Sequence, residues 1–459
     1  MSSTGRLLDI ARRALSAQQL AMDTVGHNIA NVNTEGYSRQ RVSLTAAQPA
    51  ATANGFLGQG VTVSSIERVH DEFIESQLQS EHQSLNYWST RDTYLSQIEG
   101  IYNEPSDTGL SSIMSEFWDS WSELATEPDN GSVRENVKQV GSQLCNALNN
   151  LYQRFQGLQS DLDEELKVQV SEVNSYLSQI ASLNNDIVAS ENGGSMANEY
   201  RDRRDLLLEE LSGLADVQTV ERDDGQVTVT LGGQILVERN QVYELGYTEV
   251  SNGNSVVIVP TWEENGQAID ITSGSMYSVM EARDSDIQNE LDNLDAIAVA
   301  IATSVNEIHQ TGYGTDGTTG NNFFAESTSG AQDIALDSYI LSDISKIATS
   351  STGEAGDGSV ALSIAQIQEA KIMNNNSITI DDYYASAIGA LGIHAQEATN
   401  MYENEEAMVQ QLENQKASVS GVSLDEEMTL MIQYQYAYQA AAQLITTVDE
   451  MIQTIIDMV

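Results

Sequence analysis

The C-terminal segment, residues 420–459, reads SGVSLDEEMTLMIQYQYAYQAAAQLITTVDEMIQTIIDMV. Its apolar residues recur at spacings of three and four, which is the pattern of an amphipathic helix. The stripe passes through Leu424, Met428, Met431, Gln435, Tyr438, Ile445, Val448, Ile452 and Ile455. Gln435 is the polar exception, and it either sets the register of a helix pair or lies at the solvent edge. We therefore predict a helix that packs along a second helix.

Residues 5–30 carry another stripe of the same period, in which many apolar positions are Ala. Small side chains let a helix approach closely, so this segment is expected to pair with a helix rather than with a sheet or lipid. Residues 1–50 hold five Arg and three acids, whereas residues 420–459 hold six acids and no base. Burying a large apolar side chain contributes about 1.5–3 kcal/mol, and an exposed ion pair ~0–1 kcal/mol. Apolar packing is therefore expected to hold the two ends together, while charge selects the partner.

Helical periodicity also dominates the middle of the chain. Apolar residues at the same spacings run from residue 133 to residue 187, which predicts a helix of roughly 55 residues and about 80 Å. Such a helix requires an elongated molecule. Near residue 217 the period changes to two, and Gly-containing turns separate five short β segments that end near residue 260.

The predicted fold class is mainly α and elongated, with paired terminal coiled-coil helices, a long helical rod domain and a small inserted β-rich domain. Residues 1–60 and 420–459 are assigned to a terminal helical assembly domain. Residues 61–215 and 283–419 form the rod with some mixed segments, and residues 216–282 form the β-rich outer domain.

The composition is strongly acidic, with 20 Lys and Arg, 68 Asp and Glu, and a formal net charge of −48. Such a field repels phosphate backbones, so nucleic acid is not an expected partner. No apolar run approaches the roughly 20 residues of a membrane span, so membrane insertion is not expected. Polar residues interrupt the first 30 positions, which argues against a cleaved secretory signal, and Asp9 and Asp23 argue against a mitochondrial transit peptide.

No catalytic or cofactor-binding constellation is evident. The single cysteine, Cys145, lies on the apolar stripe of the long helix, which is typical of an inert core thiol. His70 and His82 stand near several acids and superficially resemble metal ligands, but more than three helical turns separate them, which favours a solvated face. We expect no catalytic residue, no metal and no cofactor, and hence no enzyme.

The segment that ends the first helix reads NIANVNTEGY, residues 28–37. It resembles the N-terminal motif of the bacterial flagellar axial proteins, the family of rod, hook and hook-associated proteins. Residues 420–458 are similar to the C-terminal helix of that family, and ITSGSMYSVMEARD, residues 271–284, is similar to an interior landmark. The extension Ser38, Arg39 and Gln40 is most similar to the members at the junction of hook and filament.

The resemblance implies a structural subunit of the flagellum whose paired terminal helices build the inner tube while the β domain faces outward. It implies these partners: other copies of the chain, hook protein, the second hook-associated junction protein, the flagellar export apparatus and an export chaperone at the C-terminal helix. It also implies an extracellular location at the hook–filament junction, reached by type III export without a cleaved signal.

The residues that carry the resemblance are expected to be subunit contacts, together with the C-terminal stripe. They are Asn28, Asn31, Thr34, Gly36, Tyr37, Arg39 and Arg41. Residues 31–37 are expected to fix the exit from the first helix, with Gly36 at positive φ, unless they form an ordinary turn. Arg39 and Arg41 are expected to pair with acids of an adjacent subunit, unless they are plain surface arginines.

Two other functions remain open at this point. Hook protein or the second junction protein of the same axial family would share the helical ends. In a different class, the β-rich segment 216–282 could be a surface-exposed carbohydrate-binding or host-binding adhesin module, or a hydrolase, carried on an assembly scaffold.

Overall fold

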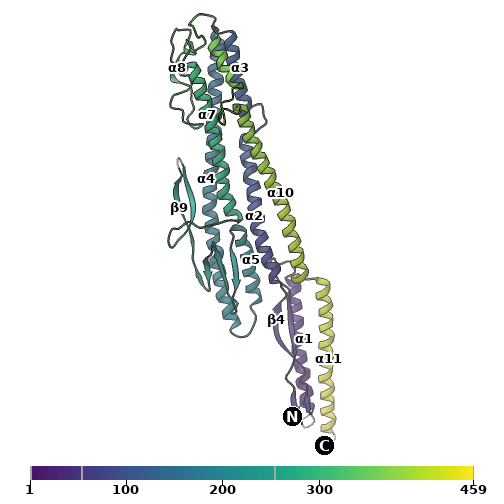
Figure 1. Cartoon of the computed structure of the whole chain (residues 1–459). Coiled ribbons are helices and arrows are strands. Elements are labelled where there is room, and N and C mark those ends of the chain that lie inside the picture. Colours follow the sequence, from purple (N-terminus) through teal and green to yellow (C-terminus); the bar gives the residue numbers. More distant parts are fainter. Residues whose placement is uncertain (1–2, 53–54, 253–254, 458–459) are drawn as a thin grey trace.

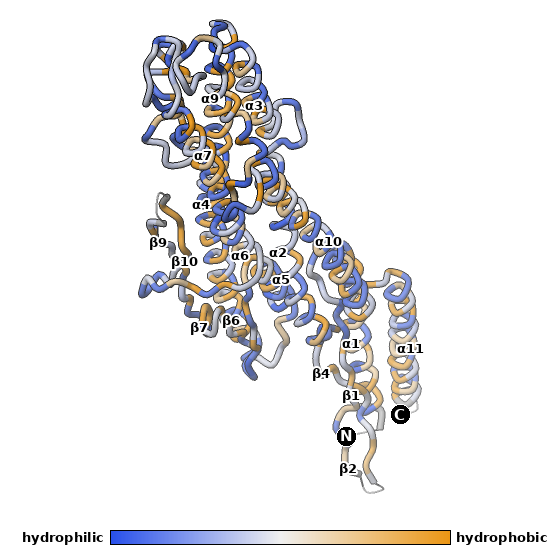
Figure 2. The backbone as a smooth tube through the Cα atoms, turned by 45° about the horizontal axis from the view of Figure 1, so that its top comes forward, coloured by the Kyte–Doolittle hydropathy of each residue, from blue (hydrophilic) through white to orange (hydrophobic). Residues whose placement is uncertain are grey.

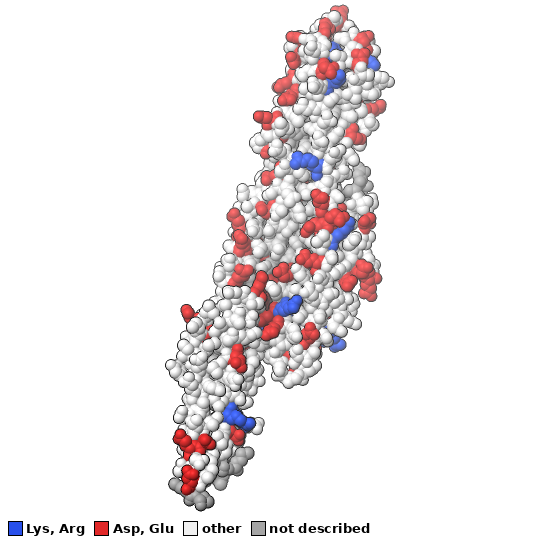
Figure 3. Space-filling view, turned by 180° about the vertical axis from the view of Figure 1, so that it is seen from behind, with Lys and Arg blue, Asp and Glu red and all other residues white. Residues whose placement is uncertain are grey.

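The computed structural model describes residues 3–52, 55–252 and 255–457, and it shows an elongated, mainly helical molecule (Figure 1). Long helices run along the axis, the β-rich segments lie on one side, and both chain ends lie together at one tip. The predicted fold class is confirmed. Acidic side chains are spread along the whole visible face and only a few separated basic ones interrupt them (Figure 3).

The two ends of the chain form one unit at that tip. Helices α1 (Ser3–Ala30) and α11 (Leu424–Asp457) run side by side in opposite directions (Figure 1). An antiparallel ribbon, β1 (Gln40–Ala46) paired with β4 (Val61–Arg68), packs against another side of α1. Helix α1 therefore lies between the ribbon and α11, and we call these elements, with the hairpin described next, the terminal unit.

The connection between β1 and β4 carries a small hairpin of β2 (Ala50–Thr52) and β3 (Gly55–Leu57). The predicted domain boundary at residue 60 falls inside the ribbon, because β4 pairs with β1 from Val61 to Arg68. The terminal unit therefore extends to Arg68. The residues of β4 by themselves contain no information about which strand pairs with it.

The rod consists of α2 (Glu72–Tyr102), α4 (Gly131–Glu191), α5 (Asn198–Leu214), α7 (Ile287–His309) and α10 (Ile380–Ser420). Helix α4 has 61 residues, which corresponds to about 92 Å at 1.5 Å per residue. Its apolar stripe is buried along nearly its whole length, as the heptad-like spacing predicted. Cys145 is part of this core, and burial raises the pKa of its thiol to about 12, so it is an inert core thiol as expected.

The end of the rod opposite the terminal unit is a head of short elements and loops. They are α3 (Leu110–Thr126), α8 (Ser338–Ser342), α9 (Ser359–Ala365) and the 3-10 turns η2 (Ile344–Lys346) and η3 (Gln366–Glu369). Aromatic rings fill the centre of the head, where Phe117 and Trp121 of α3 pack edge to face or tilted against Phe323. The polar, Gly-rich segment around residues 312–330 is irregular.

The β-rich insert contains two separate sheets rather than one. A four-stranded meander is formed by β5 (Gln218–Glu221), β6 (Val227–Leu231), β7 (Gln234–Glu238) and β8 (Gln241–Val242). The strands β9 (Leu245–Asn252) and β10 (Ser255–Trp262) form an independent hairpin. The short β segments predicted between residues 217 and 260 are therefore divided between two sheets.

Two asparagines of α4 attach these sheets to the rod. Asn174 donates to the carbonyl of Leu245 at 2.7 Å and accepts from its amide at 2.8 Å. Asn184 likewise donates to the carbonyl of Val227 at 2.8 Å and accepts from the amide of Val227 at 3.0 Å. Each carboxamide thus replaces one backbone unit of a β ladder, which satisfies strand groups that would otherwise be buried without partners.

The landmark at residues 271–284 has a structural explanation. Gly274 opens α6 (Gly274–Glu281) at φ +84°, and a Cβ there would lie 2.6 Å from the carbonyl oxygen of Leu214, so only glycine fits. A π-helical turn, η1 (Ala282–Asp286), follows and joins α6 to α7. Arg283 in this turn is fully buried and donates to Asp163 on α4 and to the carbonyl of Ile258 on β10. The turn therefore fixes the β9–β10 hairpin to the rod.

His309 at the end of α7 is buried in the head as a neutral imidazole. Its Nδ1 lies 2.7 Å from the carbonyl oxygen of Asn321, and its Nε2 accepts from the amide of Ala348 at 2.9 Å. Both ring nitrogens are therefore used, with the proton on Nδ1. Burial lowers the pKa of His309 from 6.5 to about 4.

Acid should therefore destabilise the head through His309. Below the ordinary pKa of 6.5 the unfolded chain binds a proton that the folded chain excludes, so stability falls as pH drops from 6.5 to about 4. The loss should approach about 3 kcal/mol. We expect His309→Gln to be less stable at pH 7 but to show a flatter decline in denaturant unfolding over this range. The exposed His394→Gln variant should keep the wild-type slope, and an equal slope in both variants would contradict the assignment.

Candidate functional site

The contact between α1 and α11 uses the small residues of the N-terminal stripe. Ala11, Ala17 and Ala21 are almost completely buried. On α11 the least exposed of the described side chains are Glu427, Leu430, Met431, Tyr434, Ala437, Ala441, Ala442, Ile445, Val448 and Ile452. Alanines at the contact let the two helices approach closely, as the sequence predicted.

Asn28 holds the base of this helix pair together, where α1 meets the start of α11. Its side-chain oxygen accepts from the hydroxyl of Tyr37 at 2.7 Å and from the amide of Gln40 at 3.0 Å. Its side-chain nitrogen donates to the carbonyl of Gln40 at 2.9 Å and to Glu427 at 3.0 Å. All four hydrogen-bonding positions of the carboxamide are thus occupied within the chain. With Arg39, these residues form what we call the base cluster.

Glu427 is the carboxylate of the base cluster and has no exposed surface. Its second oxygen accepts from Nε of Arg39 at 2.8 Å, so one carboxylate is bound by a cation and by an amide. Its neighbour Glu426 is largely exposed and contacts the same guanidinium at 3.2 Å. A buried carboxylate is tolerated only when it is paired and hydrogen-bonded, so the position of α11 depends on these two partners.

The exit from α1 is a tight turn closed by residues of the motif. The side chain of Asn31 donates back to the carbonyl of His27, and the hydroxyl of Thr34 donates to Asn31 at 3.1 Å. Gly36 has φ +73°, a left-handed conformation that glycine adopts without strain. Burial, with the nearby Asp202 and Glu199 carboxylates, raises the pKa of Tyr37 well above its ordinary value. Tyr37 is therefore a neutral donor at any physiological pH.

The next two residues connect the terminal unit to the rod. The amide of Ser38 donates to Asp202 on α5 at 3.1 Å. The amide of Arg39 donates to the carbonyl of Ser420, the last residue of α10, at 2.9 Å, and the carbonyl of Arg39 accepts from Val69. Arg68, at the end of β4, pairs with Asp202 at 2.9 Å and with Asp205 at 2.6 Å. Burial raises the pKa of Asp202, and the bonds from Arg68 and Ser38 oppose that rise.

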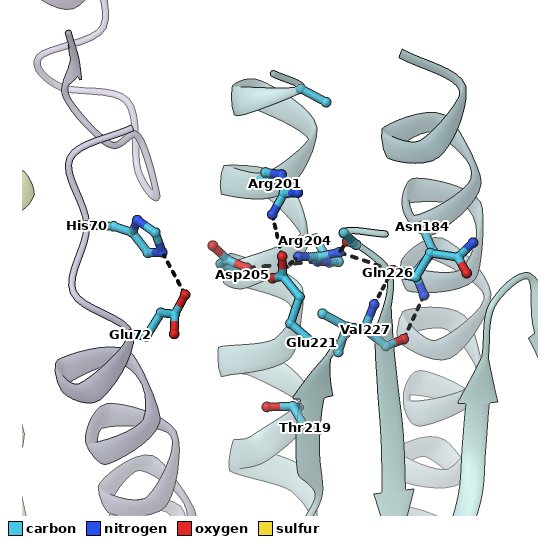
Figure 4. Close-up of polar contacts among 12 residues, drawn as sticks. His70, Glu72, Asn184, Arg201, Arg204, Asp205, Thr219, Glu221, Gln226 and Val227 are labelled. Carbon is cyan, nitrogen blue, oxygen red and sulfur yellow. Dashed lines mark hydrogen bonds and ion pairs between the residues drawn. The ribbon is translucent and has the colours of Figure 1, made fainter. Parts of the chain in front are cut away.

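Helix α5 is the platform on the rod side of this connection (Figure 4). Arg201 and Arg204 of α5 converge on Glu221 of β5, and the fully buried Arg204 also donates to Asn184 of α4. Asp202 and Asp205 of α5 thus bind the terminal unit, while Arg201 and Arg204 bind the β-rich insert and α4. Rotation of α5 would break both sets of contacts, so it is held rigidly.

A polar hollow of about 230 Å³ lies between the start of α2, α5 and β5. Figure 4 shows that His70 and Glu72 face α5 across this hollow. Nε2 of His70 lies 4.0 Å from Oε1 of Glu72. Within the described ranges, no three His, Cys, Asp or Glu side chains come close enough together to hold a metal ion. The hollow is lined by both acids and bases. Arg68 and Asp205 pair with each other, while Glu221 and Glu75 pair with Arg204 and Lys416 outside the lining.

The structure uses several of the predicted contact residues within the chain. Asn28 is buried, Tyr37 is half-buried, and Arg39 pairs with Glu426 and Glu427 of its own chain, whereas the sequence had placed the acids on an adjacent subunit. The motif follows directly on α1 and folds back onto it, which brings Arg39 beside the first turn of α11. Arg41, one strand position further on, is exposed.

The predicted α11 stripe divides into two faces. Val448 is buried and Met431, Ile445 and Ile452 are half-buried, whereas Leu424, Met428 and Tyr438 remain exposed. Gln435 is exposed, so it lies at the solvent edge and does not set the register inside this helix pair. The side chain of Ile455 lies outside the described residues. A straight α-helix drifts relative to a seven-residue repeat, which explains why one stripe serves two faces.

Sequence reasoning missed the polar residues that complete the base. Glu427, Arg68 and Asp202 had no distinguishing pattern, because acids are frequent throughout this chain. The one available signal for Glu427 was its spacing of four from Met431 on the side of the helix that faces α1.

The comparisons with known proteins agree with this architecture. Residues 95–324 match the family described as flagellar hook-associated protein FlgK helical domain. Residues 8–37 match the flagella basal body rod protein family, and residues 413–458 match the C-terminal family of the flagellar basal body rod FlgEFG proteins. The terminal unit and the rod therefore match separate families that share a flagellar origin.

Relatives match over the whole chain. The flagellar hook-associated protein 1 of Bacillus subtilis is 35% identical, over 100% of this chain and 99% of the relative. The protein of the same name from Escherichia coli is 24% identical, over 98% and 99%. The solved structure of the flagellar hook junction protein FlgK from Burkholderia pseudomallei superimposes with a TM-score of 0.68 at 18% identity, covering 75% of this chain and 100% of that one.

Fold and comparisons together define a structural protein of the bacterial flagellum. The chain belongs to the flagellar hook-associated protein 1 family.

The base cluster should control the order of α11. Replacing Glu427 by Ala removes the acceptor for Asn28 and Arg39, and we expect the opening free energy of α11 to fall by about 2–3 kcal/mol. Amide hydrogen exchange over residues 424–457 would measure this loss. Glu426→Ala, one residue earlier and exposed, is the matched control and should change exchange by no more than about 0.5 kcal/mol. Equal effects from both variants would contradict a special role for the buried carboxylate.

Proposed function

We propose that this protein is the structural subunit that joins the flagellar hook to the filament. The proposal rests on the full-length similarity to hook-associated protein 1 of Bacillus subtilis, and on an architecture in which both chain ends form one helical unit beyond the rod. Assembly is its activity: the free energy of apolar contacts between copies is released when a subunit reaches the growing tip.

One observation carries the proposal, namely the apolar surface that the helix pair leaves uncovered. Of the described elements, only α1 packs extensively on α11. The exposed large apolar residues of α11 are Leu424, Met428, Ile432, Tyr436, Tyr438, Leu444, Met451 and Ile456. So many on one helix are typical of an interface with another chain. We propose these positions, with Arg41 and the exposed Thr34 and Gly36, as subunit contacts.

The partners follow from the proposed place in the flagellum. They are further copies of this chain, hook protein on one side and the second hook-associated junction protein on the other. The subunit reaches this place from the cytoplasm through the type III export apparatus without a cleaved signal, and an export chaperone covers the apolar face of α11 before assembly. None of the described helices has the length and apolar content that crossing a membrane would need.

In this proposal the division of the chain has a functional meaning. The terminal unit builds the inner wall, the rod surrounds it, and the β-rich insert faces outward. The protein acts as a scaffold rather than as an enzyme. Its buried polar side chains form hydrogen bonds and ion pairs that join helices and sheets to one another. The base cluster and the α5 platform then hold the terminal unit at a fixed angle to the rod.

Antibody-gold labelling of detached flagella tests the location directly. We expect one narrow band where hook and filament meet, visible by electron microscopy. Label along the whole hook or the whole filament would instead identify a bulk subunit. Unlabelled flagella, in cells that synthesise the protein, would overturn the proposal.

The apolar surface of α11 should be required for incorporation. Leu444→Asp combined with Met451→Asp places two charges on it, and we expect this variant to be exported but absent from the junction. Its matched control is Thr446→Asp with Thr447→Asp, which puts the same charges on exposed polar positions of the same part of α11 and should still assemble. Immunoblots of culture supernatant and of purified flagella separate export from incorporation. Normal assembly of the Leu444 and Met451 variant would contradict the proposed contact surface.

A further inference from the structure

The terminal unit has three layers and two unpartnered outer sides. Helix α1 is the middle layer, covered on one side by the β1–β4 ribbon and on another by α11. The ribbon and α11 make no extensive contact with each other in the described residues. Each therefore presents a surface that points away from α1, and β2 lies at the far end of the unit beside the N-terminus (Figure 2).

The ribbon side is uncharged and apolar at its tip. Residues 42–66 contain no Asp, Glu, Lys or Arg, in a chain whose net charge is −48. Phe56 is 79% exposed, the highest value among the large apolar residues that the structure describes. Leu57, next to it in β3, and Leu44 of β1 are also exposed. The charges that flank this neutral stretch are Arg41 and Glu67, which lie opposite each other in the ladder. Glu67 is half-buried, whereas Arg41 is exposed and has no carboxylate within 4.0 Å in the described part of the chain.

The α11 side has the complementary character. Helix α11 contains six acids and no base. All of these acids except Glu427 are exposed, among them Asp425 near its start. Towards its end, Leu444, Met451 and Ile456 are exposed apolar residues. Helix α11 therefore offers exposed apolar residues to the β2–β3 hairpin of another copy, and exposed carboxylates to its Arg41.

The apolar residues and charges of the two sides also lie at matching positions along the axis of the α1–α11 pair. Asn28 contacts Glu427, which sets the register of the antiparallel pair. Ile10 lies 18 residues before Asn28, about 27 Å along α1, and the same distance along α11 from Glu427 leads to Ile445. Gly60 packs against Ile10, so the hairpin that projects beyond Gly60 is level with the last third of α11. Arg41 follows Gln40, which bonds Asn28, so Arg41 is level with the start of α11.

From these observations we infer that the ribbon side of one copy docks on the α11 side of the next copy at the same height. Phe56 and Leu57 contact Leu444, Met451 and Ile456 of the neighbour, and Arg41 contacts Asp425. The contact is head-to-tail, because each copy offers two different surfaces, and a repeated head-to-tail contact closes into a ring or continues as a helix. The inference rests on the proposed junction role and specifies which surfaces meet there.

Cysteine cross-linking tests this geometry in assembled flagella. The chain has one cysteine, and it is buried, so introduced thiols react selectively. We expect the double variant Phe56→Cys/Met451→Cys, treated with a short thiol-specific cross-linker, to give a ladder of covalent multimers. Each single variant should stay monomeric, because a head-to-tail contact places the two positions on different chains. Phe73→Cys/Met451→Cys, with an equally exposed thiol at the start of α2, is the matched control and should give no ladder.

The outcomes separate this inference from the junction role itself. Dimers from the single variants would show a symmetric contact and overturn the inference. Gold label at the junction without a ladder would overturn the inference and leave the junction role standing. Absence of wild-type label from the junction would overturn both.

A charge exchange provides a second measurement that does not depend on cross-linking. Arg41→Glu should lower the amount of protein in purified flagella severalfold, and adding Asp425→Arg should restore it. The same reversal at Arg222, an exposed arginine of the β-rich insert, should have no effect. Failure of the second substitution to restore incorporation would contradict the proposed contact between Arg41 and Asp425.

Discussion

The architecture of the terminal unit depends on one buried carboxylate. Glu427 has no exposed surface and is satisfied by Asn28 and Arg39, which lie 399 and 388 residues away in the sequence. An unpaired carboxylate in this position would cost several kcal/mol, so the two chain ends are ordered together or not at all. The apolar packing of α1 on α11 supplies most of the stabilisation, and the carboxylate determines which register that packing adopts.

The same device recurs wherever an element is attached to the rod. A side-chain amide or guanidinium on a helix binds backbone or carboxylate groups of a neighbour, as Asn184 does with Val227 and Arg283 with Asp163. Such contacts are directional, so they fix orientation where apolar packing alone would tolerate sliding. A subunit that must present two different surfaces to its neighbours requires this rigidity, and the acidic exterior keeps it soluble until those surfaces are covered.

Much of the helical architecture was predictable because helix formation is governed by local periodicity. The extents of α1 and α4 follow from spacings of three and four within each segment, and burial of one face is their direct consequence. The division of the β segments was less predictable, since residues 241–252 change sheets between β8 and β9 without a strong turn signal. The strand that pairs with β4 could not be predicted either, because strand pairing depends on residues that are distant in the chain.

The class of fold, the elongated shape, the pairing tendency of the two ends and the family resemblance of the motif at residues 28–37 are all contained in the sequence. They follow from periodicity, composition and short motifs, all of which are local. The three-dimensional packing was needed to show that Asn28 and Arg39 bind the chain's own α11, and that Gln435 and Met428 face outward. Those outcomes depend on which of many acids comes to lie beside which of few bases, and in a chain with 68 acids and 20 bases that choice is made by the packing of whole helices.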